Sequence, residues 1–221
     1  MAQEAGAEAL TTGRLAVAAA LRLEAAVLRS ALPGARVVRT GMGPRLAGAA
    51  AGRWLAGSPA ALAVAGLCAG LDPRLRPGDV VVASEVRGLV DPVGFPSAGA
   101  LQAALARRGV RAHLGPLQGV DHLVRGVERA RLHAAGAVVA DMESAFLVAA
   151  AGLAGRGGAE GTPLAVLRVV VDSPGHELAR PGIIVDGPRA LLSLRRAAPA
   201  LADWAAEHST TPNLSTPKEV G

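Results

Sequence analysis

Aromatic residues are almost absent from this 221-residue sequence, which contains two Trp, two Phe and no Tyr. Surfaces that bind single-stranded nucleic acid stack bases on aromatic side chains, so this scarcity argues against such a surface. Lysine is nearly absent too, because Lys218 is the only one, and the formal charge of +5 comes from arginine. The arginines are scattered, with short pairs such as Arg107-Arg108 but no long basic run. No nucleic-acid partner is expected.

Cysteine occurs only at Cys68, which excludes an internal disulfide bond and favours a reducing compartment. The five histidines lack the spacing of a metal site, and the glycine-rich turns match no nucleotide-binding fingerprint. We therefore expect no metal and no organic cofactor. No apolar run approaches the ~20 residues of a membrane span, and Arg14, Arg22 and Glu24 interrupt the segment where a signal peptide would lie. These absences predict a cytoplasmic protein.

Short apolar runs that alternate with helical patterns make up most of the chain, which is 51% hydrophobic. Strands are expected over residues 14–20, 35–40, 61–65, 80–86, 111–117, 137–140 and 163–171. Helices are expected over residues 21–32, 45–55, 100–108, 124–134 and 189–206, and a further helix is expected to run from the acidic segment at 141–143 to about residue 154. The Arg and Glu side chains of the helix at 124–134 are expected to point outward. Loops are expected over residues 88–99, 155–161 and 181–188.

This alternation predicts a single α/β domain, a three-layer sandwich in which a mostly parallel, twisted central sheet carries helices on both faces. We expect residues 1–12 to be a flexible lead-in, residues 13–208 to be the domain, and residues 209–221 to be a disordered tail. No internal repeat and no linker divides the chain.

The most informative stretch is Asp141-Met142-Glu143, which ends a buried apolar run and is followed at once by an apolar helix. Carboxylates at the end of a strand, beside the start of a helix, are typical of ligand sites in α/β proteins. In the structural alternative, Asp141 caps the helix and Glu143 lies in its first turn. The spacing alone leaves both interpretations open.

Two glycine turns follow expected strands, Gly41-Met42-Gly43 and the segment from Gly66 to Gly70. Glycine lets a backbone approach a ligand closely, and a strand–glycine–helix turn leaves backbone N–H groups for an anion or a hydroxyl. An ordinary tight turn explains either segment equally well.

Together these segments resemble the nucleoside phosphorylase and nucleosidase superfamily, which includes purine nucleoside phosphorylases and methylthioadenosine/S-adenosylhomocysteine nucleosidases. The resemblance rests on four segments in order: the helix that bears Glu24, residues 40–43, residues 66–82, and Asp141-Met142-Glu143 together with Arg168 to Asp172. In detail the residues of these motifs are most similar to those of the hopanoid-associated phosphorylase branch, whose members are thought to remove adenine from adenosylhopane.

The resemblance implies roles for several residues. Glu143 would accept hydrogen bonds from the 2′- and 3′-hydroxyls of the ribose, and Met142 would pack beneath the sugar. Asp172 would protonate or hydrogen-bond purine N7, which requires a raised pKa that burial can supply. Glu24 matches the glutamate that activates water in the hydrolytic members. The structural alternatives are a strand-end cap for Asp172 and a solvated helix face for Glu24.

The resemblance also implies two subsites. A phosphate or water site would involve Gly41, Gly43, Gly66 and Arg45, although Arg45 is equally a candidate for a solvated helix residue. A base pocket would involve Gly70, Leu123, Val124 and Asp172.

This chain departs from the family pattern at three places. Leu67-Cys68-Ala69 stands where the hydrolases carry a Ser-Ala-Gly type loop, so a hydroxyl is missing there. No Phe or Tyr lies near residues 122–124, where an aromatic side chain usually stacks on the base. Val171 occupies a position that is often Ser. Cys68 itself is expected to be a small buried packing residue rather than a nucleophile.

The resemblance implies an enzyme that cleaves the N-glycosidic bond of a purine nucleoside, releasing adenine from a 5′-substituted adenosine such as adenosylhopane. Hydrolysis and phosphorolysis, with inorganic phosphate as co-substrate, both stay open. The alternatives are a methylthioadenosine/S-adenosylhomocysteine nucleosidase and a non-catalytic nucleoside-binding module. An apolar 5′ tail would imply peripheral contact with membrane lipid and an apolar opening, for which Val90, Val93 and Phe95 are candidates. A homo-oligomer, most simply a dimer, is expected.

Overall fold

The computed structural model describes residues 15–88, 91–153, 161–174 and 183–209. The expected lead-in, residues 1–12, and all but the first residue of the expected tail, residues 209–221, lie outside them. Most of the expected loop at 155–161 lies outside them as well. None of the helices in the described part of the chain is long and apolar enough to cross a membrane.

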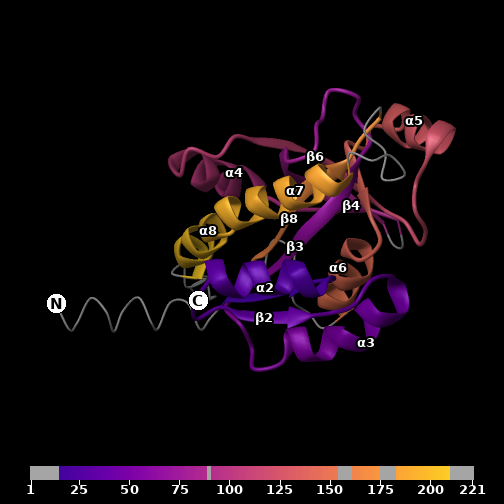
Figure 1. Cartoon of the computed structure of the whole chain (residues 1–221). Coiled ribbons are helices and arrows are strands. Elements are labelled where there is room, and N and C mark those ends of the chain that lie inside the picture. The colour runs from indigo at the N-terminus through magenta and orange to yellow at the C-terminus, as the bar shows by residue number, and fades with distance from the viewer. Residues whose placement is uncertain (1–14, 89–90, 154–160, 175–182, 210–221) are drawn as a thin grey trace, which may run out of the picture.

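The described strands form one eight-stranded sheet at the centre of the molecule (Figure 1). They are β1 (Leu15–Ala19), β2 (Arg36–Arg39), β3 (Ala61–Gly70), β4 (Val80–Arg87), β5 (Val93–Gly94), β6 (Ala112–Gly119), β7 (Val139–Asp141) and β8 (Leu164–Asp172). Every expected strand is present. Two differences matter: β3 continues to Gly70 through the expected glycine loop, and the short β5 lies within the expected loop at 88–99.

Helices surround this sheet (Figure 1). They are α2 (Arg22–Ala31), α3 (Pro44–Leu55), α4 (Ala98–Arg107), α5 (Gly126–Ala134), α6 (Ser144–Leu153), α7 (Ile183–Ala197) and α8 (Pro199–Ser209). The single closing helix expected at 189–206 is in fact two helices, and the first begins inside the expected loop at 181–188. Pro199 begins the second helix, because proline lacks the N–H and the space needed to continue the first.

The expected α/β domain with helices around a mostly parallel sheet is confirmed, but the sheet is mixed and partly closed, which the expected three-layer sandwich did not include. Strands β1–β2, β1–β3, β3–β8, β4–β6 and β6–β7 pair in parallel, whereas β3–β7, β4–β5 and β4–β8 pair antiparallel. Because β8 pairs with both β3 and β4, the strands β3, β7, β6, β4 and β8 form a closed ring.

Irregularities in two strands make this closure possible. The pairing of β3 with β8 shifts register between Cys68 and Ala69, and the pairing of β4 with β6 shifts between Ala83 and Val86. Such irregularities bend a strand and increase its twist. The first half of β3 therefore pairs with β1, whereas Ala69 and Gly70 pair with β7. The sequence predicts where the strands lie, but it reveals neither the full length of β3 nor which strands become neighbours.

The core is built from Ala, Val and Leu, with the two tryptophans, Trp54 and Trp204, fully buried. Every residue of β1 is buried, as expected for a strand covered on both faces. Helix α7 packs on β8 and α2, α3 packs on α6, and α4 packs on α8. Phe95, predicted to border a substrate opening, is instead buried in this core. The packed strands give a rigid base for the side chains at their carboxyl ends.

One tight contact in this fold is testable. Gly119 ends β6 beneath the start of α6, and a Cβ added there would lie 2.3 Å from Cβ of Ala145 and 3.0 Å from the carbonyl oxygen of Arg87. We expect Gly119→Ala to lower the free energy of unfolding by about 1–3 kcal/mol, because neither neighbour can move freely. Urea denaturation measures this change.

Gly48→Ala is the matched control, since Gly48 lies inside α3 and an added Cβ meets nothing within 4 Å. That variant should be neutral or more stable by about 0.5–1 kcal/mol. Equal destabilisation of both variants would contradict the proposed clash at Gly119.

Candidate active site

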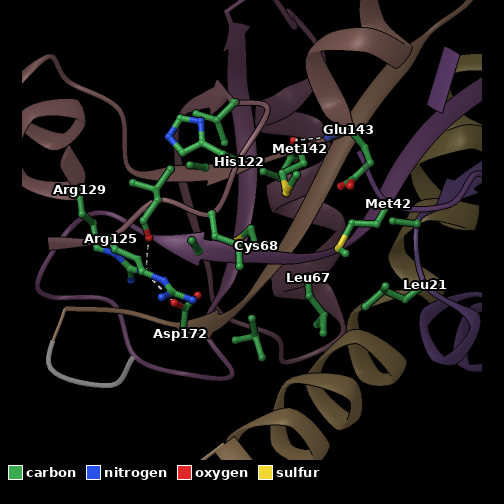
Figure 2. A pocket seen from close by; sticks show the side chains of 18 of the residues that line it. Leu21, Met42, Leu67, Cys68, His122, Arg125, Arg129, Met142, Glu143 and Asp172 are labelled. Carbon is green, nitrogen blue, oxygen red and sulfur yellow. Dashed lines mark hydrogen bonds and ion pairs between the residues drawn. The ribbon is translucent and has the colours of Figure 1, made fainter. Parts of the chain in front are cut away.

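A pocket of about 300 Å³ lies where β3, β7 and β8 end, between α2 and α5 (Figure 2). Its lining residues come from segments far apart in the sequence. They are Ala20, Leu21, Glu24, Met42, Leu67, Cys68, Ala69, Val120, His122, Leu123, Val124, Arg125, Arg129, Ala140, Asp141, Met142, Glu143, Val171 and Asp172.

Most of the predicted site residues meet in this pocket. Glu24, Leu123, Val124, Met142, Glu143 and Asp172 line it. The predicted glycines Gly41, Gly43, Gly66 and Gly70 do not line it, although three of them contact residues that do. Arg45 is exposed on α3 and does not reach the pocket, so the structure does not bring it to the predicted phosphate site.

The two carboxylates of the acidic segment differ in position. Asp141 caps α6, because its Oδ1 accepts hydrogen bonds from the backbone N–H groups of Glu143 (3.1 Å) and Ser144 (2.9 Å). Glu143 reaches across to the start of α3, where its Oε1 accepts a hydrogen bond from the N–H of Gly43 at 2.9 Å. The structural alternative, a helix cap, therefore applies to Asp141, although both carboxylates line the pocket.

Arg168, in the middle of β8, is the cation at this end of the pocket. Its side chain is 1% exposed and its Nε lies 2.6 Å from Oδ2 of Asp141, while its Nη2 donates to the hydroxyl of Ser144 at 2.9 Å. Gly66 is its partner on β3, and a Cβ there would lie 2.8 Å from both Nη1 of Arg168 and Oε1 of Glu24. Glycine at this position leaves the space in which Arg168 and Glu24 approach each other.

Glu24 is buried, and backbone amides bind both of its oxygens. Oε2 accepts from the N–H of Leu21 at 2.7 Å, and Oε1 accepts from the N–H of Leu67 at 2.8 Å. The first bond is half of a capping box at the start of α2. Glu24 is 2% exposed. It therefore does not lie on a solvated helix face.

The acidic end carries more negative than positive charge, since Glu24, Asp141 and Glu143 surround one guanidinium. Burial raises the pKa of Glu143 above its ordinary value, and Asp141 adds to this, while Arg168 opposes it. Burial lowers the pKa of Arg168, but Asp141, Glu143 and Glu24 outweigh that effect and raise it. A cation in the pocket would relieve this imbalance.

Cys68 lies in the pocket wall as a neutral thiol. Burial raises its pKa well above the ordinary value, and only Arg168 opposes the shift. A thiol with a raised pKa is a poor nucleophile. This position agrees with the expected packing role.

The opposite end of the pocket contains a buried ion pair that the sequence did not predict. Nη2 of Arg129 lies 2.6 Å from Oδ2 of Asp172, with side chains 4% and 5% exposed. Arg129 also donates to the carbonyl oxygens of Gly70 and Val124, each at 3.1 Å. The expectation that the arginines of α5 point outward is wrong for Arg129, and no local signal distinguishes it from its exposed neighbours.

The rim beside this pair carries further basic side chains. His122 places Nδ1 2.7 Å from Oδ1 of Asp121 and Nε2 2.8 Å from Oε1 of Glu128. These two hydrogen bonds raise the pKa of His122 above its ordinary value. Arg125, at the start of α5, also lines the pocket. Figure 2 shows Arg125, Arg129 and Asp172 together at one end and Glu143 with Met42 at the other.

The mouth is apolar. Leu21, Met42 and Leu123 line the pocket and are 39%, 57% and 54% exposed, respectively. Met42, between the two glycines of the predicted turn, was not predicted to line the site. Of the residues expected to form an apolar opening, Val90 lies outside the described residues, and Val93 and Phe95 do not line the pocket. Within the described chain no three His, Cys, Asp or Glu side chains are arranged to bind a metal ion.

The pocket is thus electrically asymmetric. One end can stabilise positive charge through Glu24 and Glu143, whereas Arg129 at the other end is already paired with Asp172 and leaves that end without the same negative excess. A reaction that develops positive charge at the acidic end would be favoured, because fixed charges that match a transition state lower its energy.

Comparison with known families matches residues 33–188 to the phosphorylase superfamily. No curated protein matches the sequence significantly. Among solved structures, the futalosine hydrolase of Helicobacter pylori is 15% identical with a TM-score of 0.72, over 86% of this chain and 97% of that one.

Two nucleosidase structures are similar to the same degree. The 5′-methylthioadenosine/S-adenosyl homocysteine nucleosidase of Campylobacter jejuni is 13% identical with a TM-score of 0.72, over 88% of this chain and 99% of that one. The corresponding nucleosidase of Colwellia psychrerythraea, solved with adenine, is 18% identical with a TM-score of 0.69, over 86% of this chain and 94% of that one. These likenesses establish the fold, and the hopanoid-associated branch stays a prediction.

The first prediction for this site concerns Arg168. We expect Arg168→Met to lower the free energy of unfolding by about 3–5 kcal/mol, because it leaves buried carboxylates without their cation. Urea denaturation measures the loss. Arg107→Met is the control, since it breaks an ion pair with Glu207 in which the side chains are 53% and 48% exposed, and it should barely move the urea midpoint. A small loss for Arg168→Met would mean that the acidic end is stable without it.

The second prediction concerns pH. Glu143 must be ionised to stabilise a cation, and burial raises its pKa above the ordinary value of 4.5. We therefore expect nucleoside cleavage to be lost, as the pH falls, with a midpoint above 4.5. Carboxyl NMR should give the same midpoint for the signal that disappears in Glu143→Gln.

Asp72 provides an internal reference in the same NMR titration, because its hydrogen bond from Arg74 lowers its pKa to about 2. A Glu143 midpoint at or below 4.5 would contradict the expected effect of burial.

Proposed function

The chain belongs to the phosphorylase superfamily, as its motifs predict, and from this premise we propose that it hydrolyses the N-glycosidic bond of a 5′-substituted adenosine and releases adenine. The asymmetric pocket is the observation that carries this proposal. Glycosidic cleavage develops positive charge on the ribose and negative charge on the departing base. The excess of carboxylates at one end matches the first charge, and the Arg129–Asp172 pair at the other end supplies hydrogen-bonding groups for the base.

The environment of Glu24 supports hydrolysis over phosphorolysis. A phosphate site needs free backbone N–H groups and unpaired cations. The N–H groups of Leu21 and Leu67 already donate to Glu24, whose own charge would repel an anion. Arg168 is already paired with Asp141, and Arg45 is exposed away from the pocket. Water is therefore the better-supported nucleophile.

In the proposed reaction, Glu143 accepts hydrogen bonds from the ribose hydroxyls while Met142 packs beneath the sugar. Water attacks C1′ and gives its proton to Glu24, which acts as the general base. The electron pair of the C1′–N9 bond moves into the purine. Asp172 either gives its own proton to N7, or accepts a hydrogen bond from N7 after N7 has taken a proton from solvent, so that neutral adenine departs.

Aliphatic side chains would hold the base in place of an aromatic one. Val120, Leu123 and Val124 line the pocket on the side of Asp172, and they follow β6, where family members usually carry the stacking aromatic. Aliphatic contact still removes the purine from water, which is favourable in proportion to the apolar area buried. The missing aromatic is therefore compatible with base binding.

The apolar mouth supports an apolar group at the 5′ position. A volume of about 300 Å³ is at the small end for ligand pockets, so a long substituent must leave through the mouth, past Leu21, Met42 and Leu123. Adenosylhopane, suggested by the motif resemblance, is such a substrate, and it would bring the protein to a lipid surface. The homo-oligomer stays a prediction alongside it.

Methylthioadenosine or S-adenosylhomocysteine is the second candidate substrate. The pocket volume favours it, because a short 5′ group needs no exit path. Parallel assays with short and long 5′-alkylthio adenosines separate the two candidates: a preference for the short group would favour the second, and a gain with chain length the first.

The deciding experiment measures adenine release from these adenosines with and without inorganic phosphate, and identifies the sugar product by mass. We expect free sugar in both conditions. Glu24→Gln should reduce the rate by about 10²–10⁴-fold, the usual contribution of a general base. Arg22→Gln, at an exposed position in the same helical turn, is the control and should keep the full rate.

A sugar 1-phosphate formed only with phosphate would overturn hydrolysis. Nucleoside binding without any adenine release would instead favour the non-catalytic module.

A further inference from the structure

We propose that His122 is a positioning residue of this pocket: its imidazolium bridges two carboxylates and thereby fixes the aliphatic wall against which the base packs. The bridge is complete only while both ring nitrogens carry a proton, so binding of the base is coupled to pH. This inference rests on the proposed function, because it places the base beside Leu123 and Val124. It assigns a role to a histidine that takes no part in the proposed reaction.

His122 connects the two ends of the segment that forms this wall. Residues 120–125 join β6 to α5 and belong to no helix or strand. The His122 ring lies at the edge of the pocket (Figure 2), and its Nε2 lies 2.8 Å from Oε1 of Glu128, in the first turn of α5. Leu123 and Val124 lie between these two residues in the chain and line the pocket. The contact therefore closes a short loop around the wall.

Other contacts hold the wall only in part. Helix α5 begins without a side-chain cap, and its first residue, Gly126, has a φ of +50°, in the left-handed region. Arg129 is the only buried residue of α5, and it donates to the carbonyl oxygen of Val124 at 3.1 Å. Leu123 is 54% exposed. Because segments with few buried groups open easily, the position of Leu123 depends on whether the His122 bridge is formed.

The bridge requires a doubly protonated ring. Nδ1 of His122 lies 2.7 Å from Oδ1 of Asp121, so each ring nitrogen contacts a carboxylate oxygen. An ionised carboxylate only accepts hydrogen bonds, and a neutral imidazole has one N–H and one lone pair, whereas an imidazolium has two N–H groups. In the neutral ring one nitrogen would direct its lone pair at a carboxylate, and that contact would become repulsive.

The direction of the pH effect follows from these contacts. The charged groups around His122 are Asp121, Glu128, Arg125 and, across the pocket, the Arg129–Asp172 pair. The hydrogen bonds with Asp121 and Glu128 raise the pKa of His122 above its ordinary value. The bridge is therefore complete below this raised pKa and is lost as the pH rises through it. The His122, Asp121 and Glu128 side chains are 54%, 76% and 41% exposed, so solvent keeps the effect modest.

The test measures adenine binding by calorimetry at about pH 6 and about pH 9, on either side of the range in which histidine titrates. We expect the unmodified protein to bind adenine about three- to fivefold more tightly at the lower pH, the scale of an exposed ion pair. Linkage requires an equal reciprocal effect. Saturating adenine should therefore raise the proton affinity of His122 by the same factor, which NMR titration of its ring measures.

Three variants separate this role from a structural one. His122→Arg should bind adenine tightly at both pH values, because a guanidinium keeps its protons and can donate to both carboxylates. His122→Gln should bind with the weaker affinity at both, because an amide has one donating and one accepting end. His113→Gln is the matched control: His113 lies 3.8 Å from a carboxylate oxygen of Asp79 but does not line the pocket, so the pH dependence should stay.

An adenine affinity that is the same at both pH values, an unchanged pH dependence in His122→Gln, or a His122 titration that adenine does not move would each overturn the inference. Adenine binding that is coupled to His122, without cleavage of any nucleoside, would support the inference while refuting the proposed reaction. Nucleoside cleavage without this coupling would do the reverse.

Discussion

The buried guanidinium of Arg168 is the interaction on which the acidic end of the pocket depends. Ionised carboxylates removed from water are costly unless a nearby cation offsets their charge. Arg168 approaches Glu24 and Asp141 from the middle of β8, at a position where β3 has glycine. The charge of the site and the register of the sheet are therefore linked: β8 must pair with β3 so that Arg168 faces Gly66.

Two buried arginines, Arg168 and Arg129, set the charge at the two ends of the pocket. Arg168 reduces the repulsion among the carboxylates but leaves them in excess, so that end attracts positive charge. Arg129 pairs with a single carboxylate and leaves a neutral, oriented pair beside the aliphatic base wall. Burial prevents solvent from screening either arginine. Both ends are thus prepared before any ligand enters, which is the condition under which electrostatic catalysis costs no reorganisation.

Much of this arrangement could be predicted from the sequence, and the failures have physical causes. Glu143 and Asp172 follow apolar runs, which local sequence reveals, whereas Glu24 was singled out by its match to the family motif; all three line the pocket. Arg129 was not, since an arginine in an amphipathic helix normally faces water. The structure does not bring Arg45 to the pocket, because closeness in sequence to Gly43 does not fix the direction of a side chain on α3.

Fold prediction was right about the class and incomplete about the pairing. The strands could be located in the sequence, but closure of the sheet is accompanied by register shifts along β3 and β4 that leave no distinct residue pattern. A run of small apolar residues is compatible with several neighbouring strands. The three-layer description therefore missed the closure, because sequence periodicity does not encode long-range pairing.

The place of β8 in the ring has a consequence for how the protein is made. This strand lies between β3 and β4, yet it is translated after every other strand of the described sheet. Until about residue 172 has left the ribosome, β3 and β4 each keep an unpaired edge, and the carboxylates of Glu24 and Glu143 have no buried counter-charge. The nascent chain would therefore be exposed to misassociation late in synthesis, and the pocket would form in one step when β8 is inserted.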